Sequence, residues 1–227
     1  MTIPDWYTGS DHTGEVAEGI EKLIASMDAH EAGHDDIRSA RDLLAIEDEI
    51  NWKAFLLTLV GTIHYDLEEY GEATEVLESA LGFYKPYLKT FDEVLSVYCQ
   101  ASYTSGLLRY EKEQYADAIP CFLRCLPYLH EVYDDAYVGD IYTLLNICLG
   151  LTDDAAGALV FAEAAAYTRK YDCESMENLM VAYYSSGDQT KAVEVFHALS
   201  ERCQEVDNFE RILDFARQNL GEIGVVN

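Results

Sequence analysis

The chain has 227 residues, of which 49% are hydrophobic, and its formal net charge is −27. That length and apolar content predict a folded protein, either one large domain or an array of small units. A surface this acidic repels phosphate groups and anionic lipid headgroups, so we expect neither a nucleic-acid partner nor a membrane-surface partner. The expected partner is a neutral or basic protein or peptide, and we expect no cofactor.

The first twelve residues, MTIPDWYTGSDH, have no basic stretch followed by an apolar one, so no secretory signal is predicted. No apolar run approaches the roughly 20 residues needed to span a bilayer. Six cysteines are scattered along the chain without a C-x-x-C pair, and most of them lie within helical apolar patterns. We therefore predict a soluble, cytoplasmic protein whose cysteines are buried structural thiols.

Apolar residues recur at three- and four-residue spacing from about residue 14 onward, with short Gly/Asp breaks between the runs. Strand-like alternation is missing, so the predicted class is all-α, with about 10–11 helices. We expect residues 1–13 to form an N-terminal extension. The expected helix ranges are 14–31, 35–47, 51–67, 71–88, 91–111, 115–132, 137–150, 154–171, 173–186, 188–204 and 206–220.

Residues 14–50 are expected to form a divergent helical hairpin that contains the sequence HEAGH at residues 30–34. This is H-E-x-x-H, the signature of a zinc metalloprotease helix, in which two histidines bind the metal and the glutamate deprotonates the bound water. The chemistry requires one helix to run through both histidines. It also requires a third ligand, and no G-x-x-H extension follows to supply one.

The apolar stripes on either side of HEAGH predict a turn inside this motif. Gly33 is expected to end the preceding helix, and His34 opens the next one, with acidic residues suited to its first turn. A turn there moves the two imidazoles off a shared face. We therefore predict that His30, Glu31 and His34 form no metal site and that the chain is not an enzyme.

Two adjacent segments of the chain, 61–73 and 106–118, share a residue pattern at an offset of 45. The matched pairs are Gly61 and Gly106, Tyr65 and Tyr110, Tyr70 and Tyr115, and Ala73 and Ala118, and beyond these segments Leu77 matches Phe122 and Ala80 matches Cys125. A fainter copy follows at Gly157, Phe161 and Ala164, and a clearer one at Leu179, Tyr183, Gly187, Ala192 and Phe196. Small residues let paired helices approach closely, and large residues fill the gaps between hairpins.

This pattern resembles the tetratricopeptide repeat (TPR) over roughly residues 54–206, and the resemblance implies a right-handed α-solenoid of helical hairpins. Four units are expected, and their starts lie near Ala54, Cys99, Val138 and Cys173. Most of these spacings exceed the family period of about 34 residues, so the first two units should have lengthened helices. Residues 206–227 are expected to form a capping helix and tail. A non-repetitive helical bundle is the alternative.

The resemblance implies that the first helix of each hairpin lines a concave face. This face would present Thr58, Leu59, Thr62, Tyr65, Tyr103, Thr104, Leu107, Tyr110, Tyr142, Thr143, Asn146, Leu149, Glu177, Asn178, Val181 and Tyr184. The expected partner-binding residues are Tyr65, Tyr103, Tyr110, Tyr142, Asn146, Asn178 and Tyr184. Tyrosine offers large contact area, and asparagine can pair with a peptide backbone as both donor and acceptor. The alternative is that the tyrosines pack between repeats.

Asn146 and Asn178 resemble the asparagines of the carboxylate-clamp subfamily, which grips acidic C-terminal tails of chaperones. The cationic residues that such a clamp needs are missing, so an acidic tail is not expected here. The predicted function is a non-enzymatic interaction scaffold whose groove holds an extended neutral-to-basic segment of another protein. The alternatives are a zinc-dependent peptidase or hydrolase built on His30, Glu31 and His34, and a self-associating helical module that forms a homodimer.

Overall fold

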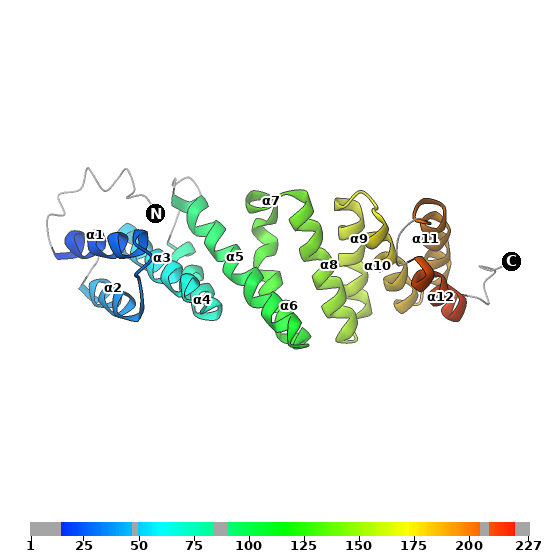
Figure 1. Cartoon of the computed structure of the whole chain (residues 1–227), viewed down its shortest axis with the longest axis horizontal. Helices are drawn as coiled ribbons and strands as arrows, with labels where there is room; N and C mark the ends of the chain where they lie inside the picture. Colours follow the sequence, from blue (N-terminus) through cyan, green and yellow to red (C-terminus); the bar gives the residue numbers. More distant parts are fainter. Residues whose placement is uncertain (1–14, 47–49, 84–89, 205–208, 221–227) are drawn as a thin grey trace. The chain divides into compact units, whose positions relative to one another are not determined.

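The computed structural model describes residues 15–46, 50–83, 90–204 and 209–220. These residues form helices joined by short turns, with no strand among them, which confirms the predicted all-α class (Figure 1). Within the described ranges, no helix is both long enough and apolar enough to cross a membrane. The helices are α1 (Glu15–Asp28), α2 (His34–Ile46), α3 (Ile50–Asp66), α4 (Tyr70–Leu81), α5 (Thr90–Glu111), α6 (Tyr115–Cys125), α7 (Leu129–Val132), α8 (Asp135–Leu151), α9 (Ala155–Thr168), α10 (Cys173–Ser185), α11 (Gln189–Arg202) and α12 (Phe209–Asn219).

The observed helices follow the predicted ranges closely, with two differences. The helix expected over 71–88 ends at Leu81, and its predicted final residues fall outside the described part of the chain. The helix expected over 115–132 is interrupted by a 3-10 turn, Leu126–Tyr128, between α6 and α7. Pro127 causes this break because proline has no amide hydrogen to continue the α-helical ladder.

The chain divides into two compact units, residues 1–105 and 106–227, with the boundary inside α5. In the first unit, α1 pairs with α2 and α3 pairs with α4, and α2 also packs against α3. The core of the first unit includes Ile20, Leu23, Ile24, Met27, Ile37, Ala40, Leu43, Trp52, Phe55, Leu56, Leu59, Val60 and Ile63.

In the second unit, α8 pairs with α9 and α10 pairs with α11, while α9 also packs against α10 (Figure 1). Burial of one face of each helix builds a core that runs from α9 through α12. Its largest members include Met176, Leu179, Met180, Phe196, Leu199, Ile212 and Leu220. Each hairpin therefore completes its apolar core with the next one, as in a helical-repeat array.

The repeat pattern at an offset of 45 corresponds to one physical contact that occurs twice. A Cβ on Gly61 would lie 2.4 Å from the Leu77 side chain, and a Cβ on Gly106 would lie 2.5 Å from the Phe122 ring. In both hairpins, the missing glycine side chain leaves the space that the large residue of the second helix fills. The small residue of the first matched position and the large residue of the second therefore contact each other across each pair of helices.

The hairpin turns of the described residues share one backbone geometry. After α5, the Glu113 N–H donates to the Tyr110 carbonyl at 2.9 Å, and the Gln114 N–H donates to the Arg109 carbonyl at 2.9 Å. Glu113 has a positive φ of 58°, as expected for a residue that ends a helix in this way. The equivalent turn residues are His30, Glu68, Asp153 and Gly187, with φ values of 57°, 62°, 64° and 89°.

The turn between α1 and α2 corrects the prediction for Gly33. His30 has the left-handed backbone that ends α1, with its N–H donating to the Met27 carbonyl at 2.9 Å. Gly33 instead precedes α2, and its N–H donates to the Asp36 carboxylate at 2.9 Å. The prediction that Gly33 ends the first helix was therefore wrong. A glycine was expected at the turn, but a histidine adopts the strained conformation.

The cysteines divide into two groups. Cys99, Cys121, Cys125 and Cys148 are buried free thiols, which confirms the prediction for these four. Cys173 and Cys203, however, form a disulfide, so the prediction was wrong for this pair. Cys173 begins α10 and Cys203 follows α11, and their antiparallel pairing brings the two Cα atoms to 5.9 Å. The spacing of cysteines along the sequence does not reveal this proximity.

Candidate functional site

The seven predicted partner-binding residues all lie on the first helices of hairpins, namely α3, α5, α8 and α10. Tyr65 and Tyr103 belong to the first unit, and the other five belong to the second unit. All are half-buried except Asn146, which is 7% exposed. The expectation that Asn146 would be accessible is therefore wrong for most of its surface. Three further residues expected on the concave face are also buried, namely Thr58, Leu59 and Thr143.

Four of the predicted tyrosines pack against other aromatic rings. Tyr65 meets Tyr70 at 5.4 Å between ring centroids, and Tyr110 meets Tyr115 at 5.6 Å, so the two hairpins again match. Tyr142 packs on Phe161 of α9 at 6.0 Å, and Tyr184 meets Phe215 of α12 at 5.5 Å. These rings therefore help to hold the helices together, as the packing alternative had it.

The two predicted asparagines line the same pocket, which has a volume of about 280 Å³. We name it the asparagine pocket. Its lining residues are Asn146, Ile147, Gly150 and Leu151 of α8, Ala158 of α9, and Asn178, Val181, Ala182 and Ser185 of α10. On each of α8 and α10, these positions recur at three- and four-residue spacing, so one face of each helix forms a wall. The structure thus brings Asn146 and Asn178 together.

Both asparagines present their amide groups without a hydrogen bond to any residue that the structure describes. An asparagine amide has two donors on its nitrogen and an acceptor oxygen. The Asn146 side chain is mostly buried, at 7% exposed, but its amide atoms are not sealed from solvent and remain open to the pocket. The pocket can therefore accept a ligand that offers both a donor and an acceptor.

The asparagine pocket has no charged side chain in its lining. Glu177, the one charged residue predicted on the concave face, is 19% exposed and accepts a hydrogen bond from Arg211 of α12 at 2.6 Å. This ion pair offsets the negative charge of α10 beside the pocket. The chain carries a net charge of −27, so an uncharged cavity is a distinctive feature of its surface.

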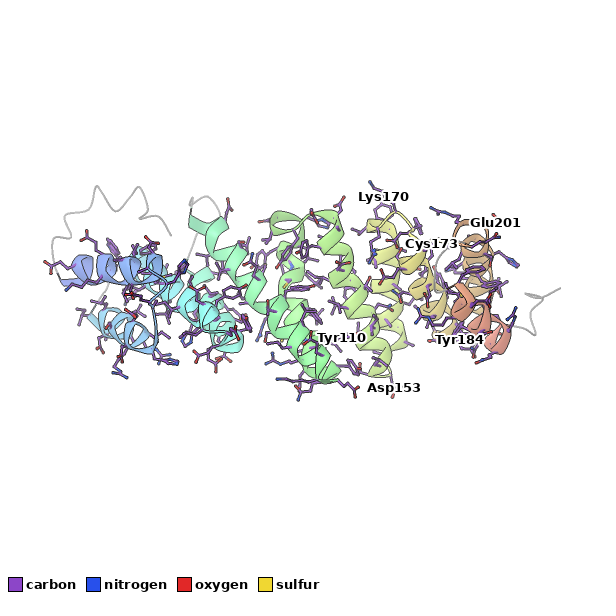
Figure 2. The ribbon with its side chains drawn as sticks, viewed as in Figure 1. Tyr110, Asp153, Lys170, Cys173, Tyr184 and Glu201 are labelled. Carbon is purple, nitrogen blue, oxygen red and sulfur yellow. A yellow bond between two sulfur atoms is a disulfide. The ribbon has the colours of Figure 1, made fainter. Side chains whose placement is uncertain are left out.

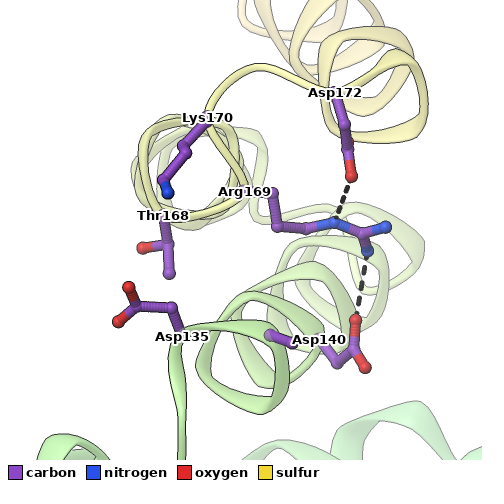
Figure 3. A pocket seen from close by; sticks show the side chains of 7 residues that line it. Asp135, Asp140, Thr168, Arg169, Lys170 and Asp172 are labelled. Atoms are coloured by element: carbon purple, nitrogen blue, oxygen red, sulfur yellow. Dashed lines mark hydrogen bonds and ion pairs between the residues drawn. The ribbon is translucent and has the colours of Figure 1, made fainter.

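A second, more charged pocket of about 450 Å³ lies at the opposite end of the same helices. Figure 2 shows Lys170 and Cys173 toward one end of the second unit and Asp153 and Tyr184 toward the other. Asp135, Asp140, Thr168, Lys170 and Asp172 line the charged pocket around Arg169 (Figure 3). Its charges are of both signs, in contrast to the asparagine pocket.

Arg169 is the centre of an ion-pair network that ties three helices together. Its guanidinium donates to Asp172 at 2.8 Å and to Asp140 at 3.1 Å (Figure 3), and also to Glu174 at 2.8 Å. Partial burial alone would raise the pKa of Asp172, but hydrogen bonds from Ser175 and Arg169 outweigh it, and the pKa is lowered. With its donors occupied in this way, Arg169 acts as a structural tie.

The HEAGH sequence does not lie on one helix. His30 occupies the turn after α1, and His34 is the first residue of α2. His34 Nε2 lies 3.3 Å from Glu69, whose other oxygen lies 2.7 Å from His64 Nδ1. The shared helix that the zinc-peptidase alternative requires is therefore absent. Across the described ranges, no group of three or more His, Cys, Asp or Glu side chains is arranged to hold a metal ion.

Several solved structures are similar to this chain. The apo form of RapI matches with a TM-score of 0.50 at 14% identity, covering 93% of this chain and 80% of that one. The TPR domain of P58(IPK) matches at 0.47 and 11% identity, over 92% of this chain and 57% of that one. MamA from Desulfovibrio magneticus RS-1 matches at 0.42 and 17% identity, over 86% of this chain and 98% of that one.

No family model matches the sequence, and no curated protein matches it significantly. The helical hairpins and the match to RapI nevertheless agree on the fold. The chain therefore has the tetratricopeptide-repeat fold that the sequence pattern predicted. At these identities the likeness extends to the fold alone, and function must be argued from the site.

Asn146, Asn178 and Val181, which were predicted to share one face, all line the asparagine pocket, but most of its apolar wall was not predicted. Ile147, Gly150 and Leu151 were not among the predicted residues, although Leu151 is 56% exposed. A signal was present, since Leu151 follows Ile147 by four residues, which is one helical turn. The helix predicted over 137–150 ended one residue before Leu151, so this residue was not placed on the same face.

Proposed function

We propose that this chain is a non-enzymatic protein-interaction scaffold, and that its asparagine pocket receives an extended segment of another protein. The observation that carries this proposal is the pair of unpartnered amides, Asn146 and Asn178, on one uncharged cavity. Each amide can donate to a backbone carbonyl and accept from a backbone N–H, which pairs with an extended peptide much as a neighbouring strand would.

The expected segment is neutral to basic. No cationic side chain lines the asparagine pocket, and the chain as a whole carries a charge of −27. An acidic segment would therefore meet a repulsive field without a local counter-charge, whereas a basic one would be attracted to the surface. The TPR2AB domain of yeast Sti1, which was solved as a complex with pHSP90, matches this chain at a TM-score of only 0.42, so it is no guide to the ligand.

The proposal is tested by partner capture from a native lysate. Asn178→Ala and Asn146→Ala should each weaken capture by about 1–3 kcal/mol, because a partner group is left without its hydrogen bond. Gln100→Ala, at an exposed position of α5 in the first unit, is the control and should have no effect. Thermal midpoints of all variants should stay close to that of the unsubstituted protein.

Capture that is unchanged in both asparagine variants would contradict the proposal. Unfolding of both variants would contradict it too, since the asparagines would then be core residues. Light scattering on the purified protein addresses the self-association alternative. Under the proposal the protein is monomeric at assay concentration, while a dimer that both asparagine substitutions dissociate would favour the homodimer reading.

A further inference from the structure

The wall of the asparagine pocket is aliphatic and open to solvent. Leu151 is 56% exposed and Val181 is 36% exposed, and Ile147, Ala158 and Ala182 complete the apolar lining. Removing such apolar surface from water lowers the free energy, so binding an apolar side chain over it is favourable. The cavity volume of about 280 Å³ suits one side chain together with the backbone on either side of it.

The polar part of the same cavity favours a peptide backbone over an anion. Asn146 is 7% exposed and unpartnered within the described residues, and it lines the cavity. A backbone amide satisfies both its donor and its acceptor. A carboxylate could accept from the amide nitrogen, but it would leave the Asn146 oxygen unpaired beside a second acceptor.

An acidic residue lies in the turn directly after the aliphatic wall's Leu151, between α8 and α9. Asp153 is exposed and follows Leu151 by two residues, and its carboxylate has no partner among the described residues. The neighbouring Asp154 is occupied, because its carboxylate accepts from the Gly157 N–H at 2.9 Å and caps α9. Figure 2 shows Asp153 at the same end of the second unit as Tyr184. A cation beside the bound side chain would thus find an available counter-charge.

We propose that the asparagine pocket holds one aliphatic side chain of the partner segment, and that Asp153 pairs with a lysine or arginine beside that side chain. This inference rests on the proposed function and adds the chemistry that selects the partner. The aliphatic wall fixes which residue enters, the two amides hold the backbone, and Asp153 sets the charge of the neighbour. An exposed ion pair of this kind adds modest affinity, so the aliphatic side chain is the main determinant.

Selection from a display library of short random peptides tests the inference on the full-length protein. The selected peptides should share one position held by Leu, Ile, Val or Met, with Lys or Arg next to it. A consensus peptide made from them should bind Val181→Asp about tenfold or more weakly, because a charge then lies in the apolar wall. The matched control Val160→Asp makes the same change at a position of α9 that is 61% exposed and should bind normally.

The substitution Asp153→Asn tests the contribution of the Asp153 negative charge alone. Asparagine tolerates the positive φ of 64° at this position, so the turn should be retained. The substitution should weaken consensus-peptide binding by about two- to fivefold and remove the preference for Lys or Arg, while the aliphatic position stays. The control Asp135→Asn, in the charged pocket at the other end of the helices, should change neither property.

The other possible results of the peptide selection each overturn a different part of the proposal. Selected peptides that depend on Asn178 but share no aliphatic position would overturn the inference and leave the proposed function standing. An aliphatic position without a basic neighbour would overturn the role of Asp153. Peptides that bind Asn146→Ala and Asn178→Ala normally, or an absence of any enriched peptide, would overturn both the inference and the proposed function.

Discussion

At the residue scale, the hairpin turns show how this chain departs from the usual chemistry of helix ends. Glycine is the common residue for a left-handed helix end because it has no Cβ. Here glycine occupies only the α10–α11 turn, at Gly187, while His30, Glu68, Glu113 and Asp153 adopt the same backbone. Side chains in this conformation cost roughly 1 kcal/mol or more each. The turns are thus held by their hydrogen bonds and by the packing of the helices on either side.

Replacing Glu113 with glycine should stabilise the protein. The substitution removes the strain at φ 58° without removing a core contact, since Glu113 is exposed. We expect a gain of about 0.5–1 kcal/mol in the free energy of unfolding, measured as an upward shift of the urea midpoint. The control Glu194→Gly, at an exposed position within α11, should destabilise by about 1 kcal/mol. Equal effects of the two substitutions would contradict the strain argument.

The raised pKa of Tyr183 predicts how the free energy of unfolding changes at alkaline pH. Burial and a 2.6 Å hydrogen bond from its hydroxyl to Glu163 raise the pKa of Tyr183 from 10.0 to about 12. Between these values the unfolded chain loses this proton while the folded chain keeps it, so stability should fall as pH rises through that range. Between pH 10.0 and about 12, the thermal midpoint of Tyr183→Phe should fall less with rising pH than that of the unsubstituted protein. Tyr167→Phe, at a ring that is 76% exposed, should follow the unsubstituted protein.

At the element scale, the contact between paired helices depends on one small and one large residue. Gly106→Ala should destabilise the hairpin of α5 and α6 by an amount on the order of 1–3 kcal/mol, because the new Cβ would lie 2.5 Å from the Phe122 ring. Urea denaturation measures the loss. Gly71→Ala, in α4 where nothing lies within 4 Å of a Cβ, should be neutral or stabilise by up to about 1 kcal/mol.

The Gly106 prediction fails if the double variant Gly106→Ala with Phe122→Ala shows strictly additive losses. A genuine steric contact requires that truncating Phe122 relieves part of the cost of the added methyl group, giving a coupling between the two positions. Additivity would mean that the small and large columns at an offset of 45 are independent of each other. The pairing seen in both hairpins would then be a coincidence of sequence.

The Cys173–Cys203 disulfide joins the start of α10 to the end of α11 across a sequence separation of 30. Closing a loop of that length in the unfolded chain should contribute about 3–4 kcal/mol. Reduction with a thiol reagent should therefore lower the unfolding midpoint of the second unit. A Cys173→Ser/Cys203→Ser variant should start at the lower midpoint and not respond to reductant. A native protein already insensitive to reductant would contradict this expectation.

The disulfide also bears on where the protein is expected to work. Such bonds are typical of oxidising compartments and rare in the reducing cytosol. The four other cysteines are buried thiols, and burial raises the pKa of Cys148 to about 11, which keeps that thiol protonated and unreactive near neutral pH. Counting free thiols in protein taken directly from its source would show whether Cys173 and Cys203 are paired there, which the cytoplasmic expectation does not foresee.

At the scale of the whole molecule, the sequence predicts features that depend on local periodicity, such as helix ranges. It does not predict contacts that depend on the register between helices. Helix ranges follow from apolar spacing. The contact of Gly106 with Phe122 follows only in part, because the large residue was expected between hairpins and lies within one. The ring contacts of Tyr142 with Phe161 and of Tyr184 with Phe215 do not follow, because they depend on how far one helix is rotated about its axis relative to the next. Of the predicted partner-binding residues, Asn146 and Asn178 line one pocket, while Tyr142 and Tyr184 pack against aromatic rings of other helices.

The two compact units each contain helical hairpins, but the asparagine pocket lies entirely in the second unit. The described part of the first unit supplies no equivalent pair of asparagines, because the concave positions matched to Asn146 and Asn178 hold Thr62 and Leu59. In this account the first unit adds surface and stability, while selection of the partner rests on α8 and α10. The acidity of the chain acts over longer distances, by favouring encounters with basic segments.

Side-chain amide signals in a nuclear magnetic resonance titration test the central claim most directly. With a captured or library-selected segment added, the Asn146 and Asn178 side-chain signals should shift together and saturate at one equivalent. The Asn219 signal should stay in place, because its amide already donates to the Phe215 carbonyl at 2.9 Å. If a binding segment saturates the protein while the Asn146 and Asn178 amides do not move, the asparagine pocket is not the binding site.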